Sequence, residues 1–161
     1  MTYQFFDFAP RIFHQIRQLF GITSQKYLKS IGPENIIGSM ITGNINTLKE
    51  QCSTGKSGSF FYYTPDSRYM LKTISHAEFL RLKSILKQYY THMVNYPQTM
   101  ITRFFGLHKI KYNKEKGGVE RIYFIIMANV FNTCRQINVR YDLKGSKLGR
   151  KTKKRETDII D

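Results

Sequence analysis

The sequence has no tryptophan, only two cysteines and only four prolines among its 161 residues. Cys52 and Cys134 lie far apart and lack the close spacing of a metal site, so we expect two free thiols in a reducing compartment. The apolar runs are much shorter than the roughly 20 residues that a membrane-spanning helix needs. The first residues carry no basic segment followed by an apolar stretch, so we expect no secretory signal and a cytoplasmic protein.

Acidic residues are also scarce: eleven Asp and Glu stand against 26 Lys and Arg, a formal charge of +15. Such an excess indicates an anionic partner, which could be nucleic acid, an acidic membrane surface or nucleotide phosphates. Charge alone does not choose among them, and a solvated basic surface would have the same composition. Hydrophobic residues make up 41% and aromatic residues 14%, which is typical of a folded domain rather than a disordered chain.

The spacing of apolar residues predicts an α+β fold. Two helices are expected to open the chain, and a long helix is expected between two antiparallel hairpins. Strands joined by short turns favour an antiparallel sheet with a helix packed against it rather than a doubly wound parallel sheet. The expected helices are residues 9–20, 23–31 and 76–90, and the expected strands are residues 59–64, 69–75, 104–112 and 119–130.

A short polar loop precedes the first expected hairpin and contains Gly55, Lys56, Ser57 and Gly58. Small residues let backbone N–H groups approach phosphate oxygens, and the lysine adds positive charge. The loop is not a Walker A motif, because Glu50 stands where that motif needs glycine and because a strand rather than a helix follows. A glycine loop between strands resembles the loop that kinases place over ATP, although an ordinary hairpin turn has the same composition.

Lys72 lies within the expected strand YMLKTIS, where alternation places it on the same face as Met70 and Ile74. A buried ammonium group needs an anionic partner. ATP phosphates and Glu78, the one acidic residue of the following helix, are the two candidates. The alternative is an edge lysine whose ammonium group reaches solvent.

Four segments together resemble the catalytic core of the phosphatidylinositol phosphate kinases: GKSGSFFYYTPDSRYMLKTIS, RFFGLHKIKY, RIYFIIMANVF and RYDLKGSKLGR. The resemblance implies the amino-terminal lobe of a protein-kinase-like fold. We expect a helical amino-terminal region at residues 1–51, an ATP-binding lobe at 52–134, and the YDLKGS strand with a basic tail at 135–161.

The same resemblance implies roles for individual residues. Lys72, Asp142 and Lys144 would act at the catalytic cleft, and Glu78 would orient Lys72. The cofactor ATP would also be bound by the glycine loop and by the backbone of the segment joining the two lobes. The loop residues are Gly55, Lys56, Ser57 and Gly58, and the joining segment is Met127, Ala128, Asn129 and Val130.

The resemblance implies that the family's carboxy-terminal lobe, with its catalytic and Mg²⁺-binding aspartates, is missing from this chain. The closing TDIID comes too soon after YDLKGS to replace it, so we assign no catalytic role to Asp158 or Asp161 and expect no metal ligand here. The expected function is ATP-dependent phosphorylation of a phosphatidylinositol monophosphate to a bisphosphate, with this lobe inactive alone. The alternative is a noncatalytic module that binds phosphoinositides or a partner protein. The position phosphorylated on the inositol ring stays open.

The basic tail supports a location at a membrane surface. Each lysine or arginine near an anionic leaflet contributes roughly 1 kcal/mol to binding. We therefore expect phosphoinositide lipids and the cytoplasmic face of membranes as partners, and a homodimer is a further possibility from the resemblance. Nucleic acid is not expected, since no recognition motif for it is present. The tail residues are Lys144, Lys147, Arg150, Lys151, Lys153, Lys154 and Arg155.

Overall fold

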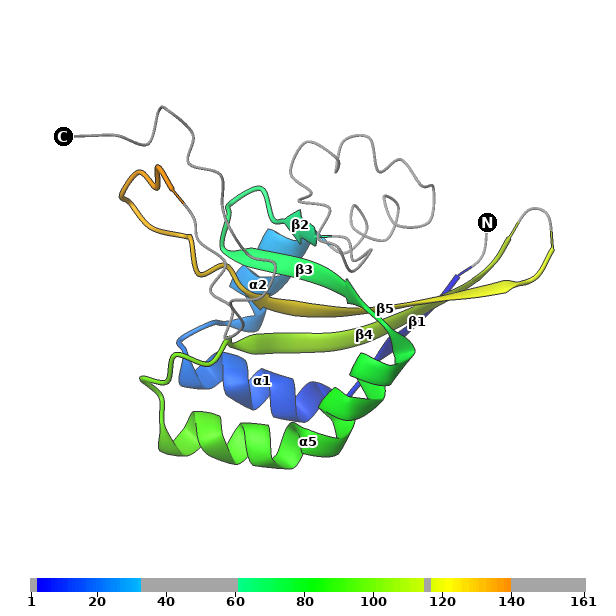
Figure 1. Ribbon diagram of the computed structural model, residues 1–161, viewed down its shortest axis with the longest axis horizontal. Helices are drawn as coiled ribbons and strands as arrows, with labels where there is room; N and C mark the ends of the chain where they lie inside the picture. Colours follow the sequence, from blue (N-terminus) through cyan, green and yellow to red (C-terminus); the bar gives the residue numbers. More distant parts are fainter. Residues whose placement is uncertain (1–2, 33–60, 115–116, 140–161) are drawn as a thin grey trace, which may run out of the picture.

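The computed structural model describes residues 3–32, 61–114 and 117–139. In these residues a five-stranded sheet with the strand order β1-β4-β5-β3-β2 is accompanied by three helices, and every neighbouring pair of strands is antiparallel (Figure 1). The predicted α+β class and antiparallel sheet are confirmed. The elements are β1 (Tyr3–Asp7), α1 (Pro10–Leu19), α2 (Ser24–Ile31), β2 (Phe61–Tyr63), β3 (Tyr69–Ile74), α5 (His76–Asn95), β4 (Phe104–Asn113) and β5 (Val119–Ala128).

The first element differs from the prediction, because the chain opens on strand β1 rather than on a helix. β1 pairs along the edge of β4, where Phe5 lies opposite Ile110 and Phe6 lies opposite Lys109. The adjacent phenylalanines give no clear alternation, so the strand depends on a neighbour that is distant in sequence. Elsewhere the bounds shift only slightly: α5 runs on to Asn95, where residues 76–90 were expected, and β5 ends at Ala128.

Local sequence signals set the ends of the two short helices. Pro10 occupies the first turn of α1, and Gly21, with φ +68, follows its end. The Thr23 hydroxyl accepts a hydrogen bond from the Lys26 backbone N–H and caps α2. Gly32, in the left-handed conformation at φ 51, ends α2.

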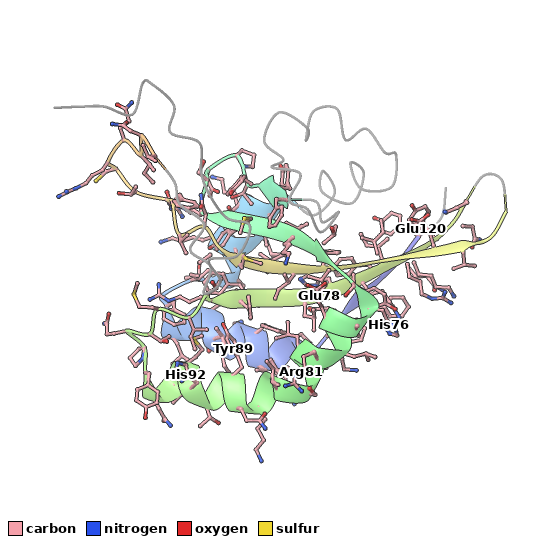
Figure 2. The ribbon with its side chains drawn as sticks, viewed as in Figure 1. His76, Glu78, Arg81, Tyr89, His92 and Glu120 are labelled. Atoms are coloured by element: carbon pink, nitrogen blue, oxygen red, sulfur yellow. The ribbon has the colours of Figure 1, made fainter. Side chains whose placement is uncertain are left out.

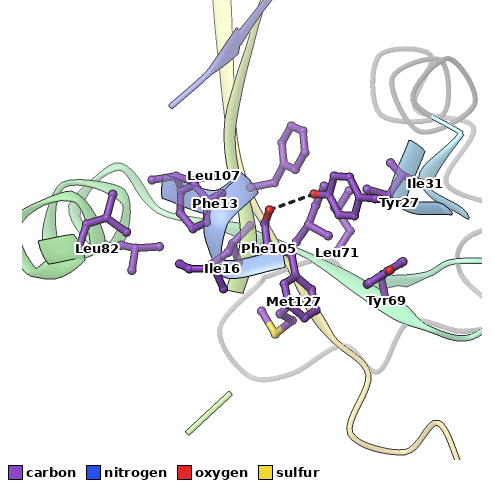
Figure 3. Close-up of a cluster of buried hydrophobic side chains, with 14 of the residues drawn as sticks. Phe13, Ile16, Tyr27, Ile31, Tyr69, Leu71, Leu82, Phe105, Leu107 and Met127 are labelled. Carbon is purple, nitrogen blue, oxygen red and sulfur yellow. Dashed lines mark hydrogen bonds between the residues drawn. The ribbon is translucent and has the colours of Figure 1, made fainter. Parts of the chain in front are cut away.

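The sheet buries both of its faces. Helices α1 and α5 lie together on one face, and α2 lies on the other (Figures 1 and 3). Phe13 and Ile16 of α1 are almost fully buried, as is Leu107 of the sheet. Tyr27 of α2 packs edge-on against Tyr69 of β3, with ring centroids 5.5 Å apart. Residues 3–32 therefore share one hydrophobic core with the sheet.

An irregularity in β4 joins the two helical layers. The register shifts between Phe104 and Gly106, so Phe105 forms a bulge. The Phe105 carbonyl accepts a hydrogen bond from Arg17 Nη1 at 2.6 Å. It accepts a second from the Tyr27 hydroxyl at 3.3 Å (Figure 3). One backbone oxygen of the sheet thus bonds to both α1 and α2.

Cys134 is a free, exposed thiol, and Cys52 lies outside the described residues. Of the helices in the described part of the chain, none has the length and apolar character required to cross a bilayer.

Candidate nucleotide site

Lys72 lies in the middle of β3, between Phe61 of β2 and Ile125 of β5. Side chains alternate along a strand, so Lys72 shares the α5 face of the sheet with Met70 and Ile74, as predicted. Its side chain is 27% exposed, and its Nζ atom lies 5.8 Å from the centroid of the Phe61 ring. The amine is therefore partly enclosed by neighbouring strands.

Helix α5 starts directly after β3 and carries Glu78 in its first turn (Figure 2). There Glu78 lies close to Lys72. A capping box fixes this start: the Ser75 hydroxyl accepts from the Glu78 N–H at 3.2 Å, and the Glu78 carboxylate accepts from the Ser75 N–H at 2.7 Å. The other carboxylate oxygen lies 3.8 Å from Lys72 Nζ. The proximity of Lys72 and Glu78 expected from the sequence is confirmed.

The electrostatics of Glu78 show which contact dominates. Hydrogen bonds from Ser75 hold the pKa of the Glu78 carboxyl below its ordinary value, while Lys72 makes a smaller contribution and burial acts in the opposite direction. Because the Glu78 side chain is 53% exposed, the ion pair itself adds little to stability. The carboxylate is held in place chiefly by the helix cap and is presented to Lys72 from there.

A cavity of about 730 Å³ opens beside this pair on the α5 face of the sheet. Most of its wall is apolar, with Lys72, Glu78 and Arg81 supplying charge at one side. An apolar slot with two cations suits a ligand that combines a planar base with an anionic group. The lining residues are Phe61, Lys72, Ile74, Ala77, Glu78, Arg81, Leu82, Ile85, Thr102, Phe104, Ile125 and Met127.

Arg81 was not singled out from the sequence. It follows Glu78 by three positions on α5, so the two side chains lie on the same side of the helix (Figure 2). The three-residue spacing from Glu78 could have indicated that Arg81 lies on the same side of the helix. It points to the cavity only once the structure shows that this side of α5 faces β3.

Only one of the four residues expected to join the lobes lines the cavity. Met127 lines the cavity beside Lys72, whereas Ala128, Asn129 and Val130 do not line it. The Ala128 N–H donates to the Arg103 carbonyl at 2.9 Å, and the Asn129 N–H donates to the Arg68 carbonyl at 3.0 Å. These two N–H groups are therefore already bonded within the lobe.

The other predicted site residues lie outside the described residues. They are Gly55, Lys56, Ser57 and Gly58 of the loop, and Asp142 and Lys144 of YDLKGS. Within residues 3–32, 61–114 and 117–139, no group of three or more His, Cys, Asp or Glu side chains is arranged to hold a metal ion.

Comparison with known proteins indicates the family of this chain. A family model described as phosphatidylinositol-4-phosphate 5-kinase matches residues 42–160. The chain is 44% identical over 147 residues to a phosphatidylinositol 4-phosphate 5-kinase of Plasmodium falciparum (isolate 3D7), covering 91% of this chain and 9% of that protein. It is 41% identical to phosphatidylinositol 4-phosphate 5-kinase its3 of Schizosaccharomyces pombe (strain 972 / ATCC 24843), covering 92% of this chain and 18% of the relative.

The chain is also similar to a plant protein. Phosphatidylinositol 4-phosphate 5-kinase 5 of Arabidopsis thaliana is 40% identical over 95% of this chain and 18% of its own length. The chain thus spans less than a fifth of each of these three relatives. With the family match covering most of the chain, and the α+β lobe that the resemblance implied present in the structure, the chain belongs to the phosphatidylinositol-4-phosphate 5-kinase family.

Proposed function

We propose that this chain is the nucleotide-binding part of an ATP-dependent lipid kinase that converts a phosphatidylinositol monophosphate to a bisphosphate. The observation that carries the proposal is the Lys72–Glu78 pair in the wall of the cavity on the α5 face. The names of the relatives support phosphatidylinositol 4-phosphate as the lipid substrate and the 5-hydroxyl as the acceptor.

In this proposal the described residues bind and orient the nucleotide. Lys72, positioned by Glu78, contacts the phosphates and offsets the negative charge that develops during transfer. Arg81 supplies a second positive charge at the same side of the cavity. Ile74, Ile125 and Met127 form an apolar wall for the adenine and keep water from the phosphates. Transfer to an inositol hydroxyl would form one P–O bond as the β–γ bridging P–O bond breaks, and it would release ADP and the hydroxyl proton.

The residues present fit ATP better than they fit a metal ion. The cavity offers both apolar surface and cations, which a nucleotide needs. Glu78 is the one carboxylate that lines it in the described part of the chain, and its oxygens already contact Ser75 and Lys72. These residues therefore do not fit a Mg²⁺ site, and our proposal assigns the metal no step that involves them.

Several predicted roles remain part of the proposal. The loop Gly55–Gly58 would cover the phosphates, and Asp142 and Lys144 would complete the cleft. The backbone of residues 127–130 would still contact adenine, through groups other than the N–H groups of Ala128 and Asn129, which are bonded elsewhere. The domain boundaries at residues 51/52 and 134/135 are likewise proposed.

Binding to an anionic membrane is the proposed route to the lipid substrate. The formal charge of +15 and the basic residues between Lys144 and Arg155 support peripheral attachment at the cytoplasmic face. A cosedimentation assay with vesicles that contain phosphatidylinositol 4-phosphate tests this step, and binding should fall as salt rises. A homodimer is proposed from the resemblance alone, and light scattering of the purified chain tests it.

Replacing Lys72 tests the nucleotide site. Lys72→Met should weaken binding of an ATP analogue about tenfold or more, because a charge-assisted contact to phosphate is lost. Lys87→Met removes an exposed positive charge from α5 without touching the cavity, and this variant should bind the ATP analogue like the unchanged chain. Equal affinity of the two variants would contradict the role of Lys72.

The alternative function is a noncatalytic module that binds phosphoinositides or a partner protein. The formal charge of +15 favours it, because that charge suits binding to anionic headgroups whether or not a phosphate is transferred. The two functions separate in an assay of phosphate transfer from ATP to phosphatidylinositol 4-phosphate, run on the 161-residue chain and on the longest polypeptide that its gene encodes. Vesicle binding without turnover in either form would support the module, and turnover would eliminate it.

A further inference from the structure

A second cavity of about 310 Å³ lies on the α2 face of the sheet, opposite the face that carries Lys72. It forms where the end of β5 meets the connection between α1 and α2. It shares no lining residue with the cavity beside Lys72, so the two are separate sites. Its lining is Phe20, Gly21, Ile22, Lys26, Arg68, Tyr69, Arg103, Phe105, Ala128, Asn129 and Asn132.

Positive charge converges on this cavity. Lys26, Arg68 and Arg103 come from three distant parts of the chain, and no carboxylate is among the lining residues. Arg68 Nε lies 3.6 Å from Asp66 Oδ2 in the adjoining surface, so part of its charge is offset. In the described part of the chain, Lys26 and Arg103 form no ion pair.

The guanidinium group of Arg103 makes few hydrogen bonds among the described residues. Its guanidinium group stacks over the Phe20 ring, 4.3 Å from the centroid, and Nη2 reaches the Pro97 carbonyl at a long 3.5 Å. Its Nε atom is buried and has no hydrogen-bond partner among the described residues. A partly desolvated cation without a counter-ion is costly, and an anion in the cavity would reduce that cost.

The end of helix α1 does not account for these cations. Cations are favoured at helix C-termini, where carbonyls lack partners. Here the backbone itself bonds those carbonyls: the N–H groups of Phe20 and Ile22 donate to Arg17, and that of Gly21 donates to Gln18. The N-terminus of α2 lies beside the same cavity, since Ile22 and Lys26 line it and stand on either side of the capping residue Thr23.

We propose that this cavity binds a phosphomonoester dianion. Guanidinium groups match phosphate oxygens with paired N–H donors, and a lysine adds a mobile charge, so Arg68, Arg103 and Lys26 form a suitable set. The Asn132 amide is a further neutral group in the wall. The volume is at the lower end for small-molecule sites, which suits a phosphorylated headgroup rather than a whole nucleotide.

The proposal goes beyond the nucleotide site and does not depend on it. The phosphate ester could be a soluble metabolite or the headgroup of a lipid, and both share the chemistry that the cavity recognises. Because the cavity adjoins Asn129, directly after β5, an occupied site would also brace the segment that leaves the sheet.

The test compares a double variant with a matched control. Lys26→Gln with Arg68→Gln removes two exposed charges from the cavity, and Lys87→Gln with Arg121→Gln removes two exposed charges that line neither cavity. Binding of inositol 1-phosphate and of vesicles containing phosphatidylinositol 4-phosphate is measured by titration calorimetry for each variant. The cavity variant should bind the ligand about tenfold more weakly, and the control should bind within about twofold of the unchanged chain.

The two ligands identify the source of the phosphate. Loss of inositol 1-phosphate binding in the cavity variant supports a soluble ligand, and loss of vesicle binding alone supports a lipid headgroup. The proposal would be overturned if binding fell equally in the cavity variant and the control, or if it did not fall in the cavity variant. Either result would mean that the phosphate binds outside this cavity, for example to the basic tail. Arg103→Lys keeps the positive charge but removes the paired N–H donors of the guanidinium group. It should therefore weaken phosphate binding less than the double variant does, which checks the result in a second variant.

Failure of this proposal is distinguishable from failure of the nucleotide site. The cavity variant should bind an ATP analogue normally, whereas Lys72→Met should not. Unchanged inositol 1-phosphate binding by Lys72→Met would confirm that the two faces act separately.

Discussion

Glu78 links local structure to the proposed chemistry at the scale of a single residue. Its carboxylate closes the capping box with Ser75 and also faces Lys72. Because its pKa is lowered, its contribution to stability is present above the pKa of the unfolded chain, about 4.3, and is lost as the pH falls through the lower folded value. At neutral pH the helix start and the position of Lys72 are therefore coupled.

The relative influence of Ser75 and Lys72 on the pKa of Glu78 can be measured. Ser75→Ala should raise the pKa of the Glu78 carboxyl more than Lys72→Met does, because the Ser75 hydroxyl lowers that pKa more than the lysine charge does. The rise should be partial, since alanine keeps the backbone N–H that donates to the carboxylate and lowers its pKa most. A ¹³C NMR titration of the carboxyl group in each variant reads this directly. A larger shift in Lys72→Met would contradict this order, because it would make the lysine charge a stronger influence on the carboxyl than the Ser75 hydroxyl.

Gly106 is a second residue with a specific physical requirement. A Cβ atom there would lie 2.4 Å from His108 Nε2 and 2.8 Å from the Tyr27 hydroxyl oxygen. Gly106→Ala should therefore lower the free energy of unfolding by about 1–3 kcal/mol, measured by urea denaturation. A change below about 0.5 kcal/mol would show that both side chains move aside without cost.

At the scale of secondary-structure elements, the Phe105 bulge is the joint between α1, α2 and β4. Burial raises the pKa of the Tyr27 hydroxyl, so it remains protonated and donates to the Phe105 carbonyl at neutral pH. Tyr27→Phe should cost about 0.5–1.5 kcal/mol of stability, and Arg17→Met about 1.5–3 kcal/mol because its donor is charged.

The effects of replacing Arg17 and Tyr27 on the free energy of unfolding should not be additive. Arg17 and Tyr27 bond to one carbonyl, and the guanidinium group stacks on the Tyr27 ring, 4.3 Å from its centroid. The cost of the double variant should therefore differ from the sum of the single costs by more than about 0.5 kcal/mol in urea denaturation. Simple additivity would indicate that the two side chains support the bulge independently.

Elements with local signals were the predictable ones. Ser75 and Glu78 stand at capping-box spacing, and the start of α5 follows from these neighbours. The same holds for the hairpin that carries Lys72. Strand β1 was missed because its five residues form a strand only against the edge of β4, and the bulge at Phe105 was missed because its partners are 88 and 78 positions away.

At the scale of the whole molecule, the sheet separates two sites of different character. The Lys72–Glu78 pair of the α5 face was predictable, since β3 and α5 adjoin in sequence. The cavity of the α2 face was not, because Lys26, Arg68 and Arg103 meet only through the strand order β1-β4-β5-β3-β2. Periodicity places residues on a face of their own element but does not say which distant elements share it.

Mapping an ATP analogue onto the chain by ¹⁵N NMR chemical-shift changes tests the central claim most directly. The account predicts the largest changes at Lys72, Glu78, Ile125 and Met127, with their loss in Lys72→Met and their retention in Lys87→Met. Saturable changes confined to the α2 face, at Tyr27 or Ile126, would contradict it, as would binding that Lys72→Met leaves unaltered.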